Sequence, residues 1–243
     1  MKAMMSTIDS IQRRWAVLIL ASVVGHAAAP TAMAQLPDLF TVSQYVECTP
    51  HALHQGQLIH LTWTGMNDPS FPLPSGYGPA LGPWEDGVFL INNFSNTLIG
   101  TAGFTGVLLP GQVYHRLEGF SIPDSVPDGT YRILVKLDYS PINPAGRIME
   151  VDEGNNEASG ILGKGSVDIT RLQIVGLRQT GNKALSVSWT SVTNCTYEIW
   201  WTQGVQTPWS LLVSNIVATP PTNTAFVMRP NSASGLFRIR ALP

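Results

Sequence analysis

The chain has 243 residues, of which 44% are hydrophobic and only 12% are charged. Its formal net charge is −2, with 14 basic and 16 acidic side chains, and this balance argues against nucleic-acid binding, which needs an excess of Lys and Arg. The content of 22 Gly and 18 Pro, combined with so few charges, favours a β-rich protein over a helical one.

Residues 1–34 are predicted to form a secretory signal peptide. Basic residues precede an apolar run at 15–25, and Ala32-Met33-Ala34 provides a small-x-small cleavage site. The apolar run is shorter than the roughly 20 residues that cross a bilayer. We therefore expect cleavage, no membrane span in the remaining chain, and a secreted protein, extracellular or periplasmic. An uncleaved N-terminal anchor is the alternative.

After residue 35, short apolar runs are interrupted by Gly or Pro, which predicts antiparallel strands. The expected fold class is all-β: two consecutive antiparallel β-sandwich domains at 35–160 and 167–243, joined by a glycine-rich linker at 161–166. The strands are expected near residues 40–47, 58–63, 87–92, 98–104, 112–120, 130–138 and 147–151, and then near 168–177, 184–190, 196–201, 210–213, 225–228 and 236–241.

Two further features stand out along the first predicted domain. Residues 67–83 contain five prolines and are expected to form a long surface loop rather than a strand, and His51 and His54 are expected in another loop. Cys48 and Cys195 fall in different predicted domains. They form either one disulfide between the domains or two buried free thiols.

Short motifs follow one another through the first domain in a fixed order: Pro37-Asp38-Leu39, Trp84-Glu85-Asp86-Gly87-Val88-Phe89-Leu90, Leu109-Pro110-Gly111-Gln112 with Tyr114, and a close formed by Glu150, Glu153, Asn155 and Asn156. Together they resemble the bacterial cell-adhesion-related domain (CARDB) over residues 36–160. The resemblance implies an immunoglobulin-like sandwich from a secreted or surface protein. The proline-rich segment 67–83 departs from the family, which often has a brief turn there.

The second domain resembles a fibronectin type III sandwich. Leu185-Ser186-Val187-Ser188-Trp189 and Thr196-Tyr197-Glu198-Ile199 match its early strands, and residues 236–241 match a late one. The tyrosine of that family's tyrosine corner is absent, and Gly235 stands in its place. The resemblance implies a fold and no activity.

An acidic, amide-rich segment closes the first domain. Oxygen-bearing side chains of this kind suit Ca²⁺, although the spacing is not that of an EF-hand loop. The alternative is a solvated turn, in which Asp and Asn bond to nearby backbone. The candidate metal ligands are Asp138, Glu150, Asp152, Glu153, Asn155 and Asn156.

Aromatic residues gather in the second domain, where Trp200, Trp201 and Trp209 are candidate ligand-binding residues. Strand alternation puts Trp200 on the face opposite Tyr197 and Trp201, so Trp200 is exposed if the other face is core. An exposed Trp stacks on a sugar ring or anchors a protein partner. The alternative is that Trp200 covers a domain interface. The remaining tryptophans expected in the cores are Trp63, Trp84 and Trp189.

No nucleophile elbow, zinc-protease motif or Cys/His catalytic arrangement is recognisable in the sequence, so we expect no enzyme. The leading hypothesis is a secreted, non-enzymatic adhesion or binding protein. It would recognise an extracellular protein or polysaccharide through its loops and exposed aromatic residues. The alternatives are a structural or accessory subunit of an extracellular assembly, and a secreted hydrolase that uses carboxylates such as Asp86.

Overall fold

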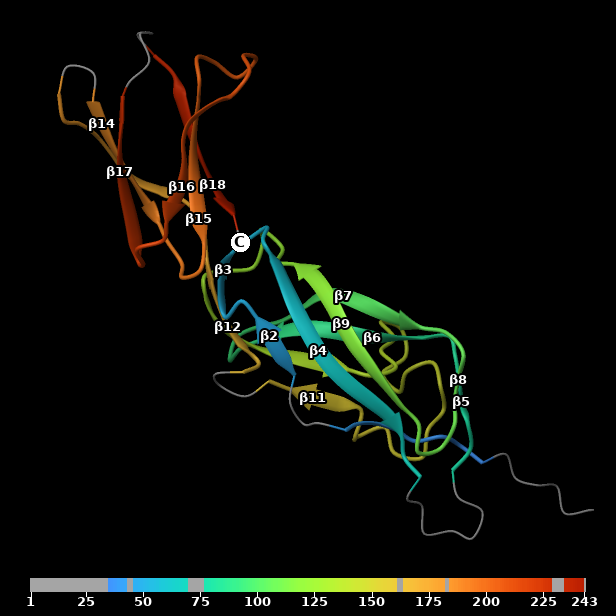
Figure 1. The fold of residues 1–243 in the computed structure, drawn as a ribbon. Helices are drawn as coiled ribbons and strands as arrows, with labels where there is room; N and C mark the ends of the chain where they lie inside the picture. The colour runs from blue at the N-terminus through green and yellow to red at the C-terminus, as the bar shows by residue number, and fades with distance from the viewer. Residues whose placement is uncertain are drawn as a thin grey trace, which may run out of the picture. The chain divides into compact units, whose positions relative to one another are not determined.

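The computed structural model describes residues 35–42, 46–69, 77–160, 164–181, 184–228 and 234–242 (Figure 1). The predicted signal peptide and part of the predicted linker lie outside these ranges. The described residues form strands and no helix, which confirms the all-β prediction. None of them belongs to a helix that is long and apolar enough to span a membrane. Residues 34–243 make up one compact unit with two hydrophobic cores.

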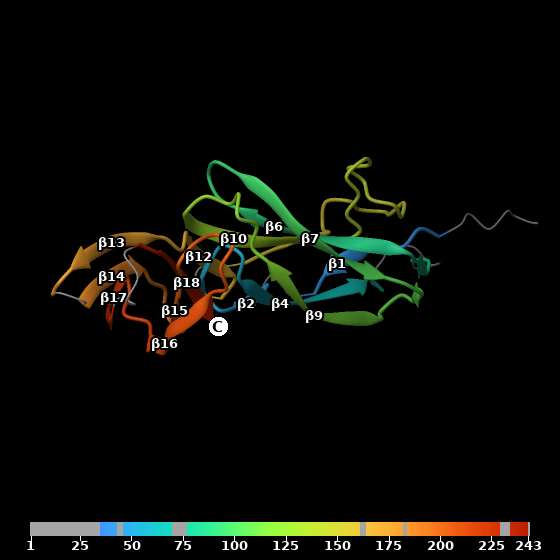
Figure 2. The same cartoon turned by 90° about the horizontal axis from the view of Figure 1, so that it is seen from above.

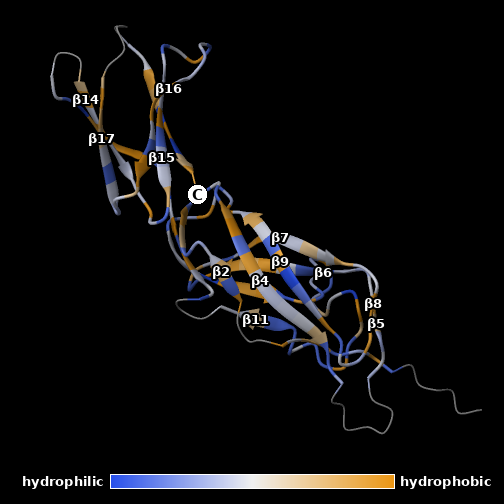
Figure 3. Ribbon diagram, viewed as in Figure 1, coloured by the Kyte–Doolittle hydropathy of each residue, from blue (hydrophilic) through white to orange (hydrophobic). Residues whose placement is uncertain are grey.

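The first core lies beneath a sheet centred on β4 (Leu58–Asn67). Strand β9 (Val113–Ser121) pairs with one edge of β4, whereas β1 (Leu39–Thr41) and β2 (Glu47–Thr49) pair with the other edge. Ile59, Leu61 and Trp63 are buried and alternate with more exposed neighbours, in the strand predicted near residues 58–63. This alternation is visible as mixed hydrophobic and hydrophilic colours along the strands in Figure 3.

A second sheet closes this sandwich. Its strand order is β3-β12-β10-β6-β7, and β11 pairs beside β12 on the same edge of β10. Figure 2 shows β6, β7 and β10 in one layer and β2, β4 and β9 in the other. A small separate ladder joins β5 to β8. The bounds are β3 Ala52–His54, β5 Ala80–Leu81, β6 Trp84–Ile91, β7 Asn96–Phe104, β8 Val107–Leu108, β10 Gly129–Lys136, β11 Glu157–Ser159 and β12 Ser166–Thr170.

Three local predictions for this sandwich are wrong. No strand forms at 147–151, because the backbone N–H groups of Arg147 and Ile148 donate to the Asp138 carboxylate instead of to a neighbouring strand. The segment 67–83 is not all loop, because it includes the last residue of β4 and the whole of β5. His54 was predicted in a loop but lies in β3, which pairs in parallel with β12. This strand has only three residues, which is too short for its pattern to be recognised in the sequence.

The second core lies between two three-stranded sheets. One has the order β13-β14-β17 and the other β16-β15-β18. Trp189, Tyr197 and Ile199 are fully buried between them. The bounds are β13 Ile174–Gln179, β14 Ala184–Thr190, β15 Thr196–Thr202, β16 Ser210–Val217, β17 Thr222–Met228 and β18 Leu236–Leu242. The predicted strand 168–177 is divided, since β12 belongs to the first sandwich and β13 to the second.

A buried histidine lies where the two cores adjoin. His54 Nδ1 bonds to the Thr170 carbonyl oxygen (2.7 Å) and Nε2 bonds to the Tyr197 hydroxyl (3.0 Å). The Thr170 carbonyl oxygen can only accept, so Nδ1 carries a proton. Burial lowers the pKa of His54, which favours the neutral ring, in which Nε2 accepts from the Tyr197 hydroxyl. Cys48 and Cys195 are both buried free thiols. The structure therefore matches the free-thiol reading and has no disulfide between the sandwiches.

Candidate functional site

The acidic segment after β10 is organised around Asp138. This residue has a positive φ of 47°, and its Oδ2 atom accepts the N–H groups of Arg147 and Ile148 at 2.7 Å each. The chain returns against this carboxylate at Gly146 (φ +82°), where a side chain would collide with Oδ2. The loop is thus wrapped around a buried carboxylate, with 1% of Asp138 exposed.

Glu150 connects this loop to the start of the first sandwich. Its Oε2 atom accepts the Leu39 backbone N–H (2.6 Å), and its Oε1 atom accepts the Asn156 side-chain amide (3.3 Å). Glu153 accepts the backbone N–H of Glu150, and Asn155 donates its side-chain amide to Asp38 (3.0 Å). Most of the predicted metal ligands thus contact one another or Asp38.

Asp152 differs from these residues, because its carboxylate accepts the Gly154 N–H in an exposed local turn. This arrangement fits the solvated-turn reading for that residue. Among the described residues, no group of three or more His, Cys, Asp and Glu side chains is arranged to hold a metal ion. Any cation bound here would need amide or backbone oxygens as well as carboxylates.

Burial and mutual repulsion hold these carboxyls closer to neutrality. Desolvation, followed by the charges of Glu153 and Asp138, raises the pKa of Glu150 to about 9. Desolvation also raises the pKa of Asp138 to about 6, against the two backbone N–H bonds that lower it. Glu150 is therefore protonated at neutral pH, whereas Asp138 is mostly ionised there.

The predicted aromatic residues lie on different surfaces of the second sandwich. Tyr197 and Ile199 face the core, which places Trp200 on the outer face of the β16-β15-β18 sheet, half-buried. Trp201 has the opposite orientation and packs over Gly235, where an added side chain would collide with its indole. The Trp201 indole therefore occupies the space beside Gly235.

Two arginines that the sequence reasoning missed join Trp200 on this outer face. Arg238 pairs across the strands with Trp200 and lies over the Trp209 ring at 5.1 Å from its centroid. Glu198 accepts the Trp200 indole N–H (2.9 Å) and pairs with Arg240 (3.9 Å). The Arg-Ile-Arg alternation in β18 was the available signal. We call Glu198, Trp200, Trp209, Arg238 and Arg240 the Trp/Arg face.

A polar cleft of about 690 Å³ adjoins the Trp/Arg face. Its lining includes Gln55, Gln57 and Asp124 from the first sandwich, together with Arg238 and Arg240. A larger hollow of about 960 Å³ lies at another place, between the turn at Asn92–Phe94 and the start of β10. None of its lining residues belongs to the Trp/Arg face, whereas Arg238 and Arg240 line the first cleft, so we regard the first cleft as the better candidate site.

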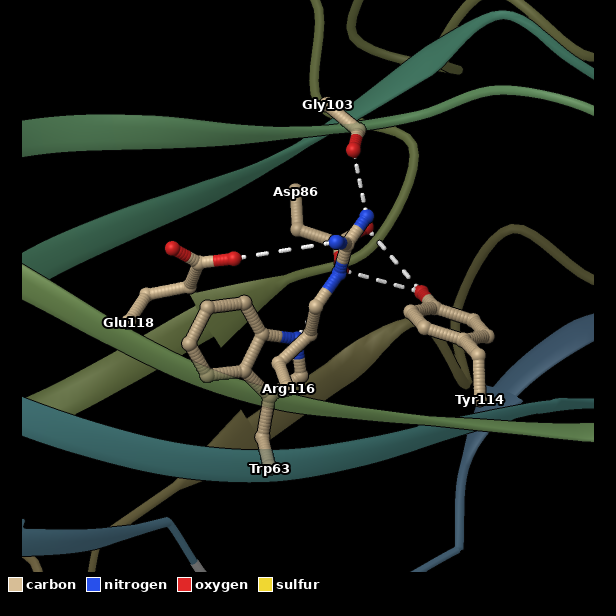
Figure 4. A network of polar contacts seen from close by, with 6 residues as sticks. All are labelled: Trp63, Asp86, Gly103, Tyr114, Arg116 and Glu118. Carbon is tan, nitrogen blue, oxygen red and sulfur yellow. Dashed lines mark hydrogen bonds and ion pairs between the residues drawn. The ribbon is translucent and has the colours of Figure 1, made fainter.

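Asp86, considered above as a catalytic carboxylate, is enclosed in the first core (Figure 4). It accepts the Trp63 indole N–H (2.9 Å) and the Tyr114 hydroxyl (3.0 Å). Desolvation raises its pKa to about 6, although both hydrogen bonds lower it. Arg116 lies over the Tyr114 ring, pairs with Glu118 (3.7 Å) and donates to the Gly103 carbonyl. Since Asp86 has no exposed surface, this network is structural.

No family model and no curated protein matches the sequence. Among solved structures, a CARDB domain from Pyrococcus furiosus in complex with di-metal ions is 18% identical, with a TM-score of 0.33, covering 56% of this chain and 90% of its own. A Niemann-Pick type C2 protein from Japanese carpenter ant is 10% identical (TM-score 0.31, covering 56% and 95%). The sporulation control protein Spo0M from Bacillus subtilis is 9% identical (TM-score 0.30, covering 65% and 69%). One structural neighbour is thus a CARDB domain.

Proposed function

We propose that this protein is a secreted, non-enzymatic binding protein, with a CARDB-like and a fibronectin type III-like sandwich, that adheres to polysaccharide at a cell surface or in a matrix. The observation that supports this is the Trp/Arg face. Indole rings stack on the apolar faces of sugars, and Arg bonds bidentately to carboxylates. The polar cleft beside the face supplies amide, carboxylate and guanidinium groups for sugar hydroxyls.

The distribution of charge favours a polysaccharide that bears acidic groups. Residues 171–243 have six basic side chains and one acidic side chain, a formal charge of +5. Residues 35–170 have five basic and 14 acidic side chains, a formal charge of −9. The Trp/Arg face belongs to the positive part of the chain, so anionic ligands are attracted to it and repelled from the first sandwich.

A second candidate function is that of a structural subunit in an extracellular assembly. Phe226 and Met228 are 70% and 68% exposed, on the outer face of the β13-β14-β17 sheet. Apolar side chains exposed together in this way mark protein interfaces. Light scattering of the purified chain at two concentrations distinguishes the candidates, because an assembly subunit associates as its concentration rises, whereas a monomeric adhesin does not.

The binding test uses residues 35–243 with a uronic-acid polysaccharide and with neutral dextran, measured by isothermal titration calorimetry. Trp200→Ala is expected to weaken binding to the acidic polymer at least about 10-fold. Phe226→Ala is the matched control, because it removes an exposed aromatic ring from the opposite sheet, and it should leave affinity unchanged.

The Arg238→Lys variant tests whether binding depends on the planar guanidinium group of Arg238 or only on its positive charge. Lys keeps the positive charge but lacks the planar group that lies over Trp209. We expect this variant to lose most of the affinity that Arg238→Ala loses. Equal binding by wild type and Trp200→Ala would refute the proposal, and release of reducing ends from the polymer would replace it with the hydrolase alternative.

A further inference from the structure

Three side-chain oxygens in the acidic segment are buried and have no hydrogen-bond partner. They are Asp138 Oδ1, Asn155 Oδ1 and Asn156 Oδ1. Asp138 and Asn156 are each only 1% exposed. A buried acceptor without a partner is unfavourable, so three of them in one short segment require an explanation such as a bound ion.

Each of these groups uses its other atom within the same cluster. Asn156 donates its amide nitrogen to Glu150, Asn155 donates its amide nitrogen to Asp38, and Asp138 accepts two N–H groups through Oδ2. Exchanging the two atoms of the Asn155 amide would turn an oxygen towards the Asp38 carboxylate. The bond to Asp38 therefore leaves the Asn155 oxygen free, and the free atom of Asp138 is an oxygen in either orientation.

The surrounding negative charge is not offset by basic side chains. Four ion pairs form among the described residues, and none includes Asp38, Asp138, Glu150, Asp152 or Glu153. A cation at this place would supply the missing partners.

The geometry points to a divalent-cation site, fitted to Ca²⁺, at the end of the first sandwich. Asp138 Oδ1, Asn155 Oδ1 and Asn156 Oδ1 are its first ligands, and Glu153, which accepts the Glu150 backbone N–H, is a further carboxylate of the same segment. Ca²⁺ accepts mixed carboxylate and amide oxygens in a flexible shell of 6–8 ligands, whereas Mg²⁺ demands a stricter octahedron. Two carboxylates with two amides also agree with the lack of any three-carboxylate cluster among the described residues.

A cation here would join three separate parts of the first sandwich. Asp138 follows β10, Asn155 and Asn156 precede β11, and the bonds to Asp38 and Leu39 reach β1. The expected consequence is stabilisation of the folded chain. Ligand that binds only the native state at 100 times its Kd raises the folding equilibrium constant about 100-fold.

The test is calorimetric titration of residues 35–243 with CaCl₂ and with MgCl₂, together with thermal melts in Ca²⁺ and in EDTA. We expect 1:1 Ca²⁺ binding, weaker Mg²⁺ binding and a melting temperature raised by several degrees. Asp138→Asn keeps an oxygen for the two N–H groups but replaces the free oxygen with an NH₂ group. This variant should fold and lose Ca²⁺ affinity at least about 10-fold.

Glu47→Gln is the matched control, because it removes one exposed carboxylate of the same sandwich outside the cluster. It should bind Ca²⁺ like the wild type. The inference is overturned by the absence of binding heat and melting shift in the wild type, or by equal losses in Glu47→Gln and Asp138→Asn. No polysaccharide enters these measurements, so their outcome is independent of the proposed adhesion function.

Discussion

Replacement of Asp86 by Asn is predicted to stabilise the protein at neutral pH, although most substitutions in a core destabilise. Asp86 is fully buried, and its pKa of about 6 lies above the value near 4 expected in the unfolded chain. The folded state therefore binds the proton more tightly. Stability from this group is fully present below the unfolded pKa and is lost as pH rises through the folded pKa.

The pKa difference of about two units corresponds to about 3 kcal/mol, of which about 2 kcal/mol is lost between pH 4.5 and pH 7.5. Asn resembles the protonated acid, since its oxygen can accept the Trp63 N–H and its amide can donate to Tyr114. Asp86→Asn should therefore exceed the wild type in unfolding free energy by up to about 3 kcal/mol at pH 7.5. Its advantage at pH 4.5 should be about 1 kcal/mol.

Urea unfolding of residues 35–243 at both pH values measures this difference directly. Asp86→Ala is the comparison variant, because it leaves the Trp63 indole and the Tyr114 hydroxyl without an acceptor. At pH 4.5 it should be less stable than the wild type by about 2–5 kcal/mol, from two unpaired donors and a small cavity, and at pH 7.5 this deficit should be about 2 kcal/mol smaller. If the unfolding free energies of wild type and Asp86→Asn change in parallel with pH, the carboxyl does not titrate in this range and the reasoning is refuted.

Three other outcomes follow from the same kind of argument. Desolvation lowers the pKa of His54, so the stability that its neutral ring contributes should be present above pH 6.5 and lost as pH falls. Tyr197→Phe removes the hydroxyl bonded to His54 and should lower the unfolding free energy in urea at pH 7.5 by about 1 kcal/mol. An unchanged unfolding free energy would contradict the hydrogen bond. Gly65→Ala would force a methyl group into a tyrosine ring and should cost about 1–3 kcal/mol, whereas Gly103→Ala meets open space and should be nearly neutral. The two cysteines should be unreactive to a thiol reagent in the native protein and both reactive after unfolding, since burial raises both pKa values.

Local patterns predicted most of the strands and the two cores. Ile59, Leu61 and Trp63 alternate at period two, and the structure buries all three. The prediction failed at 147–151, which has a strand-like composition. There, the Asp138 carboxylate accepts backbone N–H groups that a strand would donate to a neighbouring strand. The alternation of apolar and polar residues does not reveal that a side chain competes with a strand for these N–H groups.

The candidate sites were harder to predict than the strands, because they depend on contacts between residues that are distant in the sequence. Trp200, a predicted ligand-binding residue, forms part of a candidate site only together with Arg238. Arg238 lies beside Trp200 because β15 and β18 pair in this register. The Asp86 network likewise depends on β4, β6 and β9 meeting around one carboxylate. The acidic segment was easier to find, because most of its members are close in sequence, but its link to Asp38 was not predictable.

The opposite charges of the two sandwiches connect the two proposals. A chain with −9 in residues 35–170 and +5 in residues 171–243 attracts a cation to one part and an anionic polymer to the other. Ca²⁺ at the acidic segment would reduce the negative potential that repels the polymer from the first sandwich. Ca²⁺ should therefore tighten binding of the acidic polysaccharide modestly and in a salt-dependent way, because potentials over such distances are screened beyond about 10 Å at 0.1 M salt. The same ion should not change binding of a neutral polymer, since stacking on Trp200 and Trp209 does not depend on that field.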